Sequence, residues 1–288
     1  MTRRDILIGS VSTALGLSGC KSLSRSVVPA TIKSIEKNGV SGSSASQTVM
    51  SAEEGYEFAR QQRLSSLSSY PALQAYIKEL RNIPAGTFRY GFFHGQHQAA
   101  PIVDVPAFRM GSTPVTWAIW KEYCEAEGVS LPQEPEWGRL DNHPVVYVSY
   151  ENIVGTSGSG GFCGWASRLA GFDVALPTDV QYEYGSRGGR DGYDYPWGNE
   201  FDSSKFWYGA KRTAEVDRPY RNYRNGYGLT DMAGNVKQWC SNDYERGKEV
   251  RGGSWYHIYP DFFRCAYRDW GNRDGRSDQN GFRLSAPA

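Results

Sequence analysis

Apolar side chains recur three or four residues apart over residues 52–81, a spacing that is typical of amphipathic helices. The positions that carry this pattern are Tyr56, Ala59, Leu64, Leu67, Leu73, Tyr76, Ile77 and Leu80. Pro71 interrupts the pattern at a position that suits the first turn of a helix. Proline is tolerated there because the N–H groups of the first turn have no acceptor within the helix. The pattern therefore predicts two consecutive helices. The first is less regular, because Phe58 lies off its apolar stripe.

Beyond this region the pattern changes to short strands and loops that are broken by short helices. We expect one helix after Thr116, a second over residues 162–169 and a third after Thr178, where the residues have capping-box spacing. The run Pro144–Ser149 is apolar and rich in valine, and it predicts a strand. After Ser186 glycine, asparagine, aspartate and tyrosine dominate, which predicts loops with short strands.

Residues 256–280 show neither the helical nor the strand period of apolar side chains. They are enclosed by two short blocks that carry glycine and aromatic residues. We call these residues the bracketed segment, and the blocks 251–255 and 281–284 its brackets. The segment carries many aromatic side chains among Asp, Asn, Ser, Gly and Arg, and it has no Lys, Glu or Met. Rigid rings supply contact area and small polar groups supply adaptable hydrogen bonds, so this composition is typical of a binding surface.

The bracketed segment also has the composition expected of diversification through adenine-rich codons. Randomising both adenines of an AAC or AAT codon gives every residue type except Lys, Glu, Gln, Met and Trp. Within the segment only Trp270 and Gln279 fall outside that set. A second interpretation stays open, in which the segment is an irregular loop region that packs with its own aromatic side chains.

Composition limits the classes of function that this chain can have. It has 288 residues and a formal net charge of +1, which argues against electrostatic recognition of nucleic acid or of an anionic membrane. The length suits one large domain with appendages. Aromatic residues make up 14% of the chain, and it has 33 glycines, which favours a tightly turned, aromatic-packed domain over a helical bundle.

The N-terminus resembles a lipoprotein signal peptide rather than part of a fold. Thr2–Ile8 resembles a twin-arginine export signal, and Leu17–Cys20 resembles a lipobox, in which Cys20 is lipidated after cleavage. The apolar run between them is too short to span a bilayer. We therefore expect a lipid anchor to the membrane at Cys20 and a place on the outer surface of the bacterial cell envelope. The predicted organisation is a signal peptide (1–20), a Ser-rich tether (21–50), a helical segment (51–82) and the main domain (83–288).

The remaining cysteines are Cys124, Cys163, Cys240 and Cys265. Four cysteines allow three pairings. The twin-arginine route exports proteins that have already folded in the reducing cytosol. We therefore expect these cysteines to be buried free thiols, which pack as small apolar side chains. The nearest approach to a metal-binding motif is His94 with His97, which we interpret as two surface histidines.

A series of short motifs then occurs in a fixed order along the chain. The motifs are Ile83–Phe88, Pro114–Thr116, His143–Val145, Leu176–Thr178, Tyr195–Gly198, Gly228–Val236, Trp239, Arg251–Ser254 and Gly281–Arg283. In this order they resemble the formylglycine-generating enzyme/sulfatase-modifying factor domain family over about residues 83 to 288. The resemblance implies an α+β domain with the C-type lectin-like fold and much irregular structure.

The same resemblance argues against catalysis. The family's enzymes convert a sulfatase cysteine to formylglycine with two copper-binding cysteines that precede an Arg-Cys-Ala block. The corresponding interval here, Trp255–Phe263, contains no cysteine, and Cys265 belongs to the Arg-Cys-Ala block itself. One thiolate cannot build a two-thiolate copper site, so we expect no catalytic residue, no metal and no cofactor. Some relatives bind calcium near a Glu that is Gln238 here, and a neutral amide is a weaker calcium ligand.

Within the family, the variable proteins of diversity-generating retroelements fit both the export signal and the bracketed segment. The resemblance implies a surface-displayed, ligand-binding lipoprotein that binds a protein or a host surface molecule and no nucleic acid. The residues expected on its binding face are Tyr256, His257, Tyr259, Asp261, Phe262, Tyr267, Asp269, Trp270, Asn272, Asp274, Ser277 and Asp278. Two alternatives stay open: a formylglycine-generating type of oxidase, and a structural lipoprotein of the envelope.

The brackets are expected to fix the ends of the segment. Large side chains would anchor in the core at Trp239, Trp255 and Phe282, and Gly252 and Gly253 would adopt backbone conformations that other residues avoid. The segment's arginines are either ties to the scaffold or binding groups, and the sequence leaves both possibilities open. These arginines are Arg264, Arg268, Arg273 and Arg276.

Overall fold

The computed structural model describes residues 51–95, 100–156 and 160–288. The predictions for the signal peptide, the tether and Cys20 concern residues outside these ranges, as does the one for His97. Within the described ranges, no helix has the length and the apolar character needed to cross a bilayer.

The helices begin and end where the local sequence signals place them, and the predicted helices are confirmed. Pro71 begins its helix, and Gly128 ends another in the left-handed conformation at φ +64°. The side chain of Thr178 accepts the N–H of Gln181, whose side chain in turn accepts the N–H of Thr178. The bounds are α1 Ala52–Ser68, α2 Pro71–Lys78, α3 Trp117–Glu127, α4 Tyr150–Val154, α5 Gly161–Ala170, α6 Asp179–Arg187 and the 3-10 helix η1 Pro260–Phe263.

The strands of the described chain form small sheets in the orders β1–β4–β9, β2–β3 and β7–β6–β5–β8. Their bounds are β1 Leu80–Ile83, β2 Gly86–Arg89, β3 Ile102–Val105, β4 Phe108–Gly111, β5 Lys237–Tyr244, β6 Gly247–Arg251, β7 Asp269–Gly271, β8 Asn280–Gly281 and β9 Ser285–Pro287. β5 and β6 are antiparallel and pair Gln238 with Arg251. β7 adds to this hairpin from the bracketed segment and pairs Trp270 with Glu249. The segment is therefore attached to the sheet through its own backbone.

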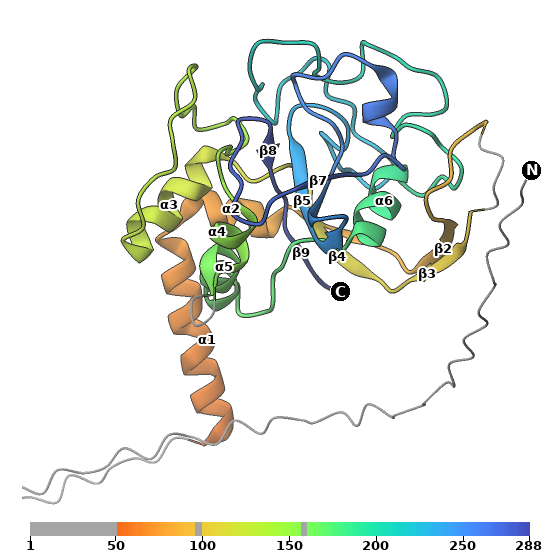
Figure 1. Cartoon of the computed structure of the whole chain (residues 1–288). Helices are drawn as coiled ribbons and strands as arrows, with labels where there is room; N and C mark the ends of the chain where they lie inside the picture. The colour runs from red at the N-terminus through yellow and green to blue at the C-terminus, as the bar shows by residue number, and fades with distance from the viewer. Residues whose placement is uncertain (1–50, 96–99, 157–159) are drawn as a thin grey trace, which may run out of the picture. The chain divides into compact units, whose positions relative to one another are not determined.

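A core of aromatic rings holds the helices against the sheets. Trp120 stacks on Phe162 with ring centroids 5.2 Å apart, and the ring of Phe282 meets both of them edge-on. The hydroxyl of Tyr76 in α2 accepts the N–H of Leu284, so α2 is bound to the C-terminal end of the chain. Figure 1 shows α3, α4 and α5 grouped on one side of β5 and α6 on the other. The fold is mixed α+β, as predicted.

The strand predicted over Pro144–Ser149 is wrong. This run makes only an isolated bridge from Pro144 to Thr116, and Tyr147 has φ +60°. The N–H of Tyr147 bonds to the carbonyl of Ser277 in the bracketed segment rather than to a neighbouring strand. Val145, Val146 and Val148 are nonetheless buried, so the run is apolar because it lies in the core.

Candidate ligand-binding face

Both brackets are buried along their whole length. The indoles of Trp239 and Trp255 and the ring of Phe282 lie in the core, as predicted. Gly253 has φ +66°, and a Cβ atom added there would meet the Phe263 ring at 2.6 Å. No larger residue fits at this position, so the bracket fixes where the bracketed segment starts.

A network of buried ion pairs ties the first bracket to the segment. The Arg251 side chain is fully buried and pairs with Glu249 at 2.6 Å and with Glu183 of α6 at 3.1 Å. Its Nη1 also donates to the carbonyl of Cys265. Arg268 donates to the other oxygen of Glu249 at 2.8 Å. The middle of the segment therefore packs on a buried network of ion pairs and is hydrogen-bonded to it.

The structure separates the four arginines of the segment by role. Arg268 is a tie to the scaffold, since its main partner Glu249 is fully buried. Arg264 lies between the exposed Asp261 and the buried Asp194. Arg273 and Arg276 are exposed, and Arg273 lies 4.0 Å from the exposed carboxylate of Asp243.

Five predicted residues of the binding face form one continuous cluster of rings on the surface. The rings of His257 and Phe262 have centroids 4.3 Å apart, and Phe262 also contacts Tyr259 at 6.3 Å and Tyr267 at 5.2 Å. Tyr256 joins the cluster through His257 at 6.4 Å. We call these five residues the ring cluster. Together they offer a ligand both ring faces and hydroxyl groups.

Two rings of the cluster are highly exposed for large aromatic residues, and the other three are half-buried. Tyr256 is 63% exposed and Tyr259 is 65% exposed, and Ile258 between them is 59% exposed. Sequence reasoning missed Ile258, although it lies inside the segment and isoleucine is among the residue types that adenine randomisation gives. Exposed apolar side chains that adjoin one another mark an interaction site.

The other predicted residues lie beside the ring cluster rather than within it. Asp261 is exposed in η1, and Asp269 and Trp270 are half-buried in β7. Asp269 accepts a hydrogen bond from Lys237 at 2.9 Å. The last four line a turn that is bonded to residues 147 and 151; they are Asn272, Asp274, Ser277 and Asp278. Burial raises the pKa of the Asp278 carboxyl.

His257 links the ring cluster to the first bracket. Its Nδ1 accepts the backbone N–H of Ser254 at 3.0 Å and lies 2.9 Å from the Ser254 hydroxyl, which donates to Gln279. Partial burial lowers the pKa of His257 to about 4, and the charge of Lys237 acts in the same direction. The imidazole is therefore neutral at pH 7, and its Nδ1 is an acceptor.

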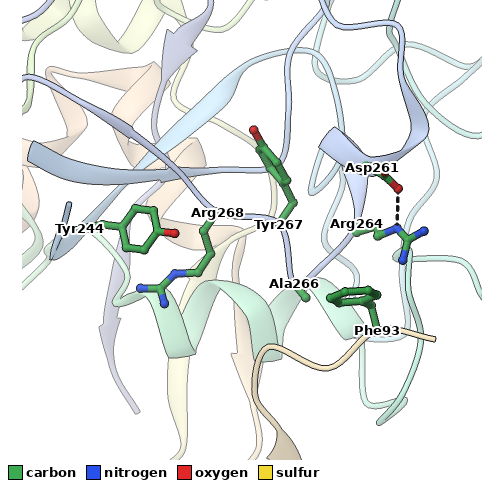
Figure 2. Close-up of a pocket in the computed structure, with 7 residues that line it drawn as sticks. All are labelled: Phe93, Tyr244, Asp261, Arg264, Ala266, Tyr267 and Arg268. Atoms are coloured by element: carbon green, nitrogen blue, oxygen red, sulfur yellow. Dashed lines mark ion pairs between the residues drawn. The ribbon is translucent and has the colours of Figure 1, made fainter. Parts of the chain in front are cut away.

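A recess of about 400 Å³ opens next to the ring cluster. Its lining residues are Phe93, Tyr244, Asp261, Arg264, Ala266, Tyr267 and Arg268. Figure 2 shows Arg264 and Arg268 on opposite sides of Ala266, with the carboxylate of Asp261 against Arg264. Asp261 and Tyr267 were predicted on the binding face. Phe93 and Tyr244 were not, because both lie outside the bracketed segment.

Comparison with known families decides which family this arrangement belongs to. The profile of the sulfatase-modifying factor enzyme 1-like domain matches residues 70–287. This chain belongs to that family. The match begins at residue 70, so α2, whose Leu73 and Tyr76 are buried in the core, lies within the family domain.

Curated members of the sulfatase-modifying factor family include both active and inactive proteins. The formylglycine-generating enzyme of Streptomyces coelicolor is 30% identical over 194 residues, which cover 54% of this chain and 58% of the enzyme. The inactive Cα-formylglycine-generating enzyme 2 of Mus musculus is also 30% identical, over 61% of this chain and 57% of that protein. The chain thus spans less than two thirds of each of these relatives.

Solved structures of similar fold also come from differently named proteins. PvdO from Pseudomonas aeruginosa aligns with a TM-score of 0.61 and 23% identity, over 73% of this chain and 94% of that one. Treponema denticola variable protein 1 aligns with a TM-score of 0.57 and 20% identity, over 73% and 95%. The fold is therefore the C-type lectin-like fold of the formylglycine-generating type, as the sequence predicted.

Cysteines in this member of the family are buried and unpaired in the described chain. Cys124, Cys163, Cys240 and Cys265 are all free thiols, as predicted. Cys265 contacts the hydroxyl of Ser186 at 3.1 Å, and burial raises the pKa of its thiol to about 12. This thiol therefore stays protonated at neutral pH and is a poor nucleophile and a poor metal ligand.

Gln238, which stands where some relatives have a calcium-binding Glu, is fully buried. Its amide nitrogen donates to the carbonyl of Asp231, and its amide oxygen accepts from Arg283. Both ends of the amide are occupied by scaffold hydrogen bonds. Gln238 therefore ties the second bracket to β5 instead of facing a cation.

Proposed function

We propose that this protein is a lipid-anchored, non-catalytic binding protein of the bacterial cell surface, and that its bracketed segment is a diversified binding face. One observation carries the proposal. The ring cluster lies at the surface, with Tyr256 and Tyr259 exposed and the other three rings half-buried, while the brackets that hold it are buried along their whole length. Side chains on this face can change without a change in the residues that support the fold.

The buried ion pairs beneath the segment order the binding surface before a ligand binds. Binding costs less when the binding surface is already ordered, because few degrees of freedom are lost on association. Arg251 and Arg268 hold the segment's backbone through Cys265 and Glu249. Aromatic side chains then contribute most of the binding energy, and the neighbouring aspartates tune specificity.

The partner that fits this face is a protein or another molecule of a host surface. Tyr256, Ile258 and Tyr259 project apolar and hydroxyl-bearing surface of the kind that is enriched at protein interfaces. A formal net charge of +1 offers no broad basic surface for nucleic acid. Asp261 and Arg264, which line the recess together with Tyr267, supply a polar rim.

Anchoring through Cys20 completes the proposal, since it would hold the domain at a membrane surface. Replacement by serine removes the thiol that would carry the lipid, and each buried lipid methylene contributes about 0.8 kcal/mol to membrane binding. Detergent-phase partitioning of the mature protein should be lost in Cys20→Ser. Retention in the detergent phase would mean that another feature binds the membrane.

Sequencing the gene from sister isolates tests the diversified face. Substitutions should concentrate in residues 256–280 and should spare the brackets and the ion pairs of Arg251. Substitutions spread evenly over the domain would contradict the proposal. A neighbouring reverse transcriptase gene with a near-copy of the segment would support it.

A formylglycine-generating activity is the second candidate, favoured by the identity to enzymes of that name. Such an activity requires a reactive thiol pair in the interval before Cys265. That interval, Trp255–Phe263, contains rings and a proline in place of cysteines. The chemistry of the residues therefore supports the binding function over the enzymatic one.

A further inference from the structure

The two arginines of the recess in Figure 2 are held by partners of very different kinds. Arg268 donates from Nε and Nη2 to Glu249 at 3.0 and 2.8 Å, and the side chain of Glu249 is fully buried. Arg264 Nε instead lies 3.0 Å from the carboxylate of Asp261, whose side chain is 76% exposed. A ligand can therefore take the place of a carboxylate at Arg264 but not at Arg268.

The contact between Arg264 and Asp261 is close but poorly aligned. Arg264 Nε lies at ion-pair distance from Asp261 and yet has no hydrogen-bond partner among the described residues, although this nitrogen is buried. The next carboxylate, of Asp194, is 3.7 Å from Nη1. A buried N–H without an aligned acceptor is unfavourable, so a better-placed acceptor is favoured at this atom once Asp261 turns away.

The surroundings of Arg264 favour an acceptor that is attached to an apolar body. The guanidinium lies over the Phe93 ring at 5.0 Å from its centroid. Tyr267 forms another part of the lining, and burial raises the pKa of its phenol to about 12, so that it remains a hydrogen-bond donor. A recess of about 400 Å³ accepts an acidic side chain or a small aromatic acid.

We infer that the recess binds a carboxylate group of the ligand at Arg264, in exchange for Asp261. In the free protein Asp261 is an internal competitor for that guanidinium, so residue 261 sets whether the recess accepts acids or neutral groups. The inference rests on the proposed function, because Asp261 belongs to the face that is diversified. An exposed ion pair shifts an equilibrium by at most about fivefold, so Asp261 weakens carboxylate binding without preventing it.

Carboxylate binding is tested with two probes, titrated into the purified protein by isothermal calorimetry. One is glutamate with its amino group acetylated and its α-carboxyl amidated, which represents an acidic side chain of a protein. The other is benzoate, a free aromatic acid, with benzamide as its neutral counterpart. Preference for the first points to a protein ligand, and preference for benzoate points to a small-molecule acid. Either preference supports the site.

Asp261→Asn should bind the preferred carboxylate about five- to tenfold more tightly than the natural protein, because it removes both a competitor and a like charge. Arg264→Gln should lose binding, and neither change should affect benzamide. Arg264→Lys keeps the charge and should bind with intermediate affinity, which gives a readout if Arg264→Gln does not fold. Asp104→Asn is the matched control, since Asp104 is an exposed aspartate of β3 that lies outside the bracketed segment and does not line the recess.

An equal gain in Asp104→Asn would overturn the inference, because it would show a general effect of charge. Unchanged binding in Arg264→Gln, or no carboxylate binding in any of the proteins, would overturn it too. Exchange of residues 256–280 between two sister variants separates this inference from the proposed function. If ligand preference moves with the exchanged segment while no carboxylate binds, only this inference fails. If carboxylates bind at Arg264 while preference stays with the scaffold, the proposed function fails and the recess remains a binding site.

Discussion

Arg251 Nη1 donates a 3.0 Å hydrogen bond to the main-chain carbonyl of Cys265. Arg251 belongs to the first bracket, and Cys265 lies in the middle of the bracketed segment. The same guanidinium is paired with Glu183 and Glu249, both fully buried. A residue outside the bracketed segment thus holds the backbone of that segment from the protein interior. The bond uses a main-chain atom that every residue type at position 265 would supply.

Loss of Arg251 should destabilise the protein strongly. Arg251→Ala should lower the free energy of unfolding by about 3–5 kcal/mol, because it leaves two buried carboxylates without their shared partner. Arg273→Ala is the matched control: the Arg273 side chain is 56% exposed, and its loss should cost no more than about 0.5 kcal/mol. Urea unfolding followed by tryptophan fluorescence measures both. Similar values for the two variants would show that the network does not hold the segment.

Scaffold and surface aromatics should also differ in their effect on stability. Trp239→Ala should cost about 3–5 kcal/mol as a large-to-small change in the core, whereas Tyr256→Ala should stay within about 0.5 kcal/mol. Trp270→Ala should fall between them, since Trp270 is half-buried and packs against Gly247. Chemical unfolding at pH 7 gives the three values. A Tyr256→Ala loss as large as that of Trp239→Ala would mean that the segment is part of the core.

Local signals in the sequence predicted most of the helices and the buried brackets. The capping pair of Thr178 and Gln181 and the stop at Gly128 act within a few residues, so they can be read without knowledge of the fold. The run Pro144–Ser149 misled because burial and strand formation give the same apolar pattern. Its hydrogen-bond partners, which include Val115 and Ser277, are distant in sequence.

The recess could not be predicted for the same physical reason. Phe93 and Tyr244 meet Arg264 and Arg268 only after β5, β6 and the loop that follows β2 have folded together. The pairing of Arg268 with Glu249 likewise depends on the register of the sheet. Sequence reasoning left the roles of the arginines open, and only their buried or exposed partners separate them.

Protonation of His257 should make the protein less stable as the pH falls from about 6.5 towards 4. The upper limit is the usual pKa of histidine, which applies in the unfolded chain. Partial burial lowers the pKa of His257 to about 4 in the folded protein, and its Nδ1 accepts the N–H of Ser254. The unfolded chain therefore binds a proton in this interval that the folded protein excludes. Stability that is fully present above pH 6.5 is lost progressively below it.

Unfolding free energies at pH 7 and pH 5 measure this effect. His257→Gln should lose less stability between the two values than the natural protein does. His94→Gln serves as the control, because the His94 side chain is 53% exposed and is bonded to Asp194 instead. An unchanged pH dependence in His257→Gln would show that the half-buried imidazole does not couple folding to protonation.

No formylglycine should form when the protein is incubated with a sulfatase-derived cysteine peptide, copper and oxygen. The interval before Cys265 lacks the thiol pair, and the Cys265 thiol is protonated at neutral pH because burial raises its pKa to about 12. Mass spectrometry of the peptide is the readout. Turnover that disappears in Cys265→Ala would place catalysis at that thiol, and turnover that persists would reveal a different site. Both outcomes contradict a purely binding role.

The ring cluster and the neighbouring Trp270 should contain the residues on which binding depends most. Two or three of Tyr256, Tyr259, Phe262, Tyr267 and Trp270 should each cost about 2 kcal/mol or more of binding free energy when truncated to alanine. Asp269 and Ser277 should cost less and should alter specificity instead. Affinities of the alanine variants for the ligand of the natural protein give the ranking. A ranking in which the polar positions dominate would contradict this account.

Exchange of residues 256–280 between two sister variants tests the central claim most directly. The chimera keeps both brackets, Arg251 and the buried carboxylates, so its thermal unfolding should stay close to that of the parent scaffold. Its ligand preference, measured by surface binding against the ligands of both parents, should follow the donor of the segment. A well-folded chimera whose preference stays with the scaffold would contradict the claim that this segment is the binding face.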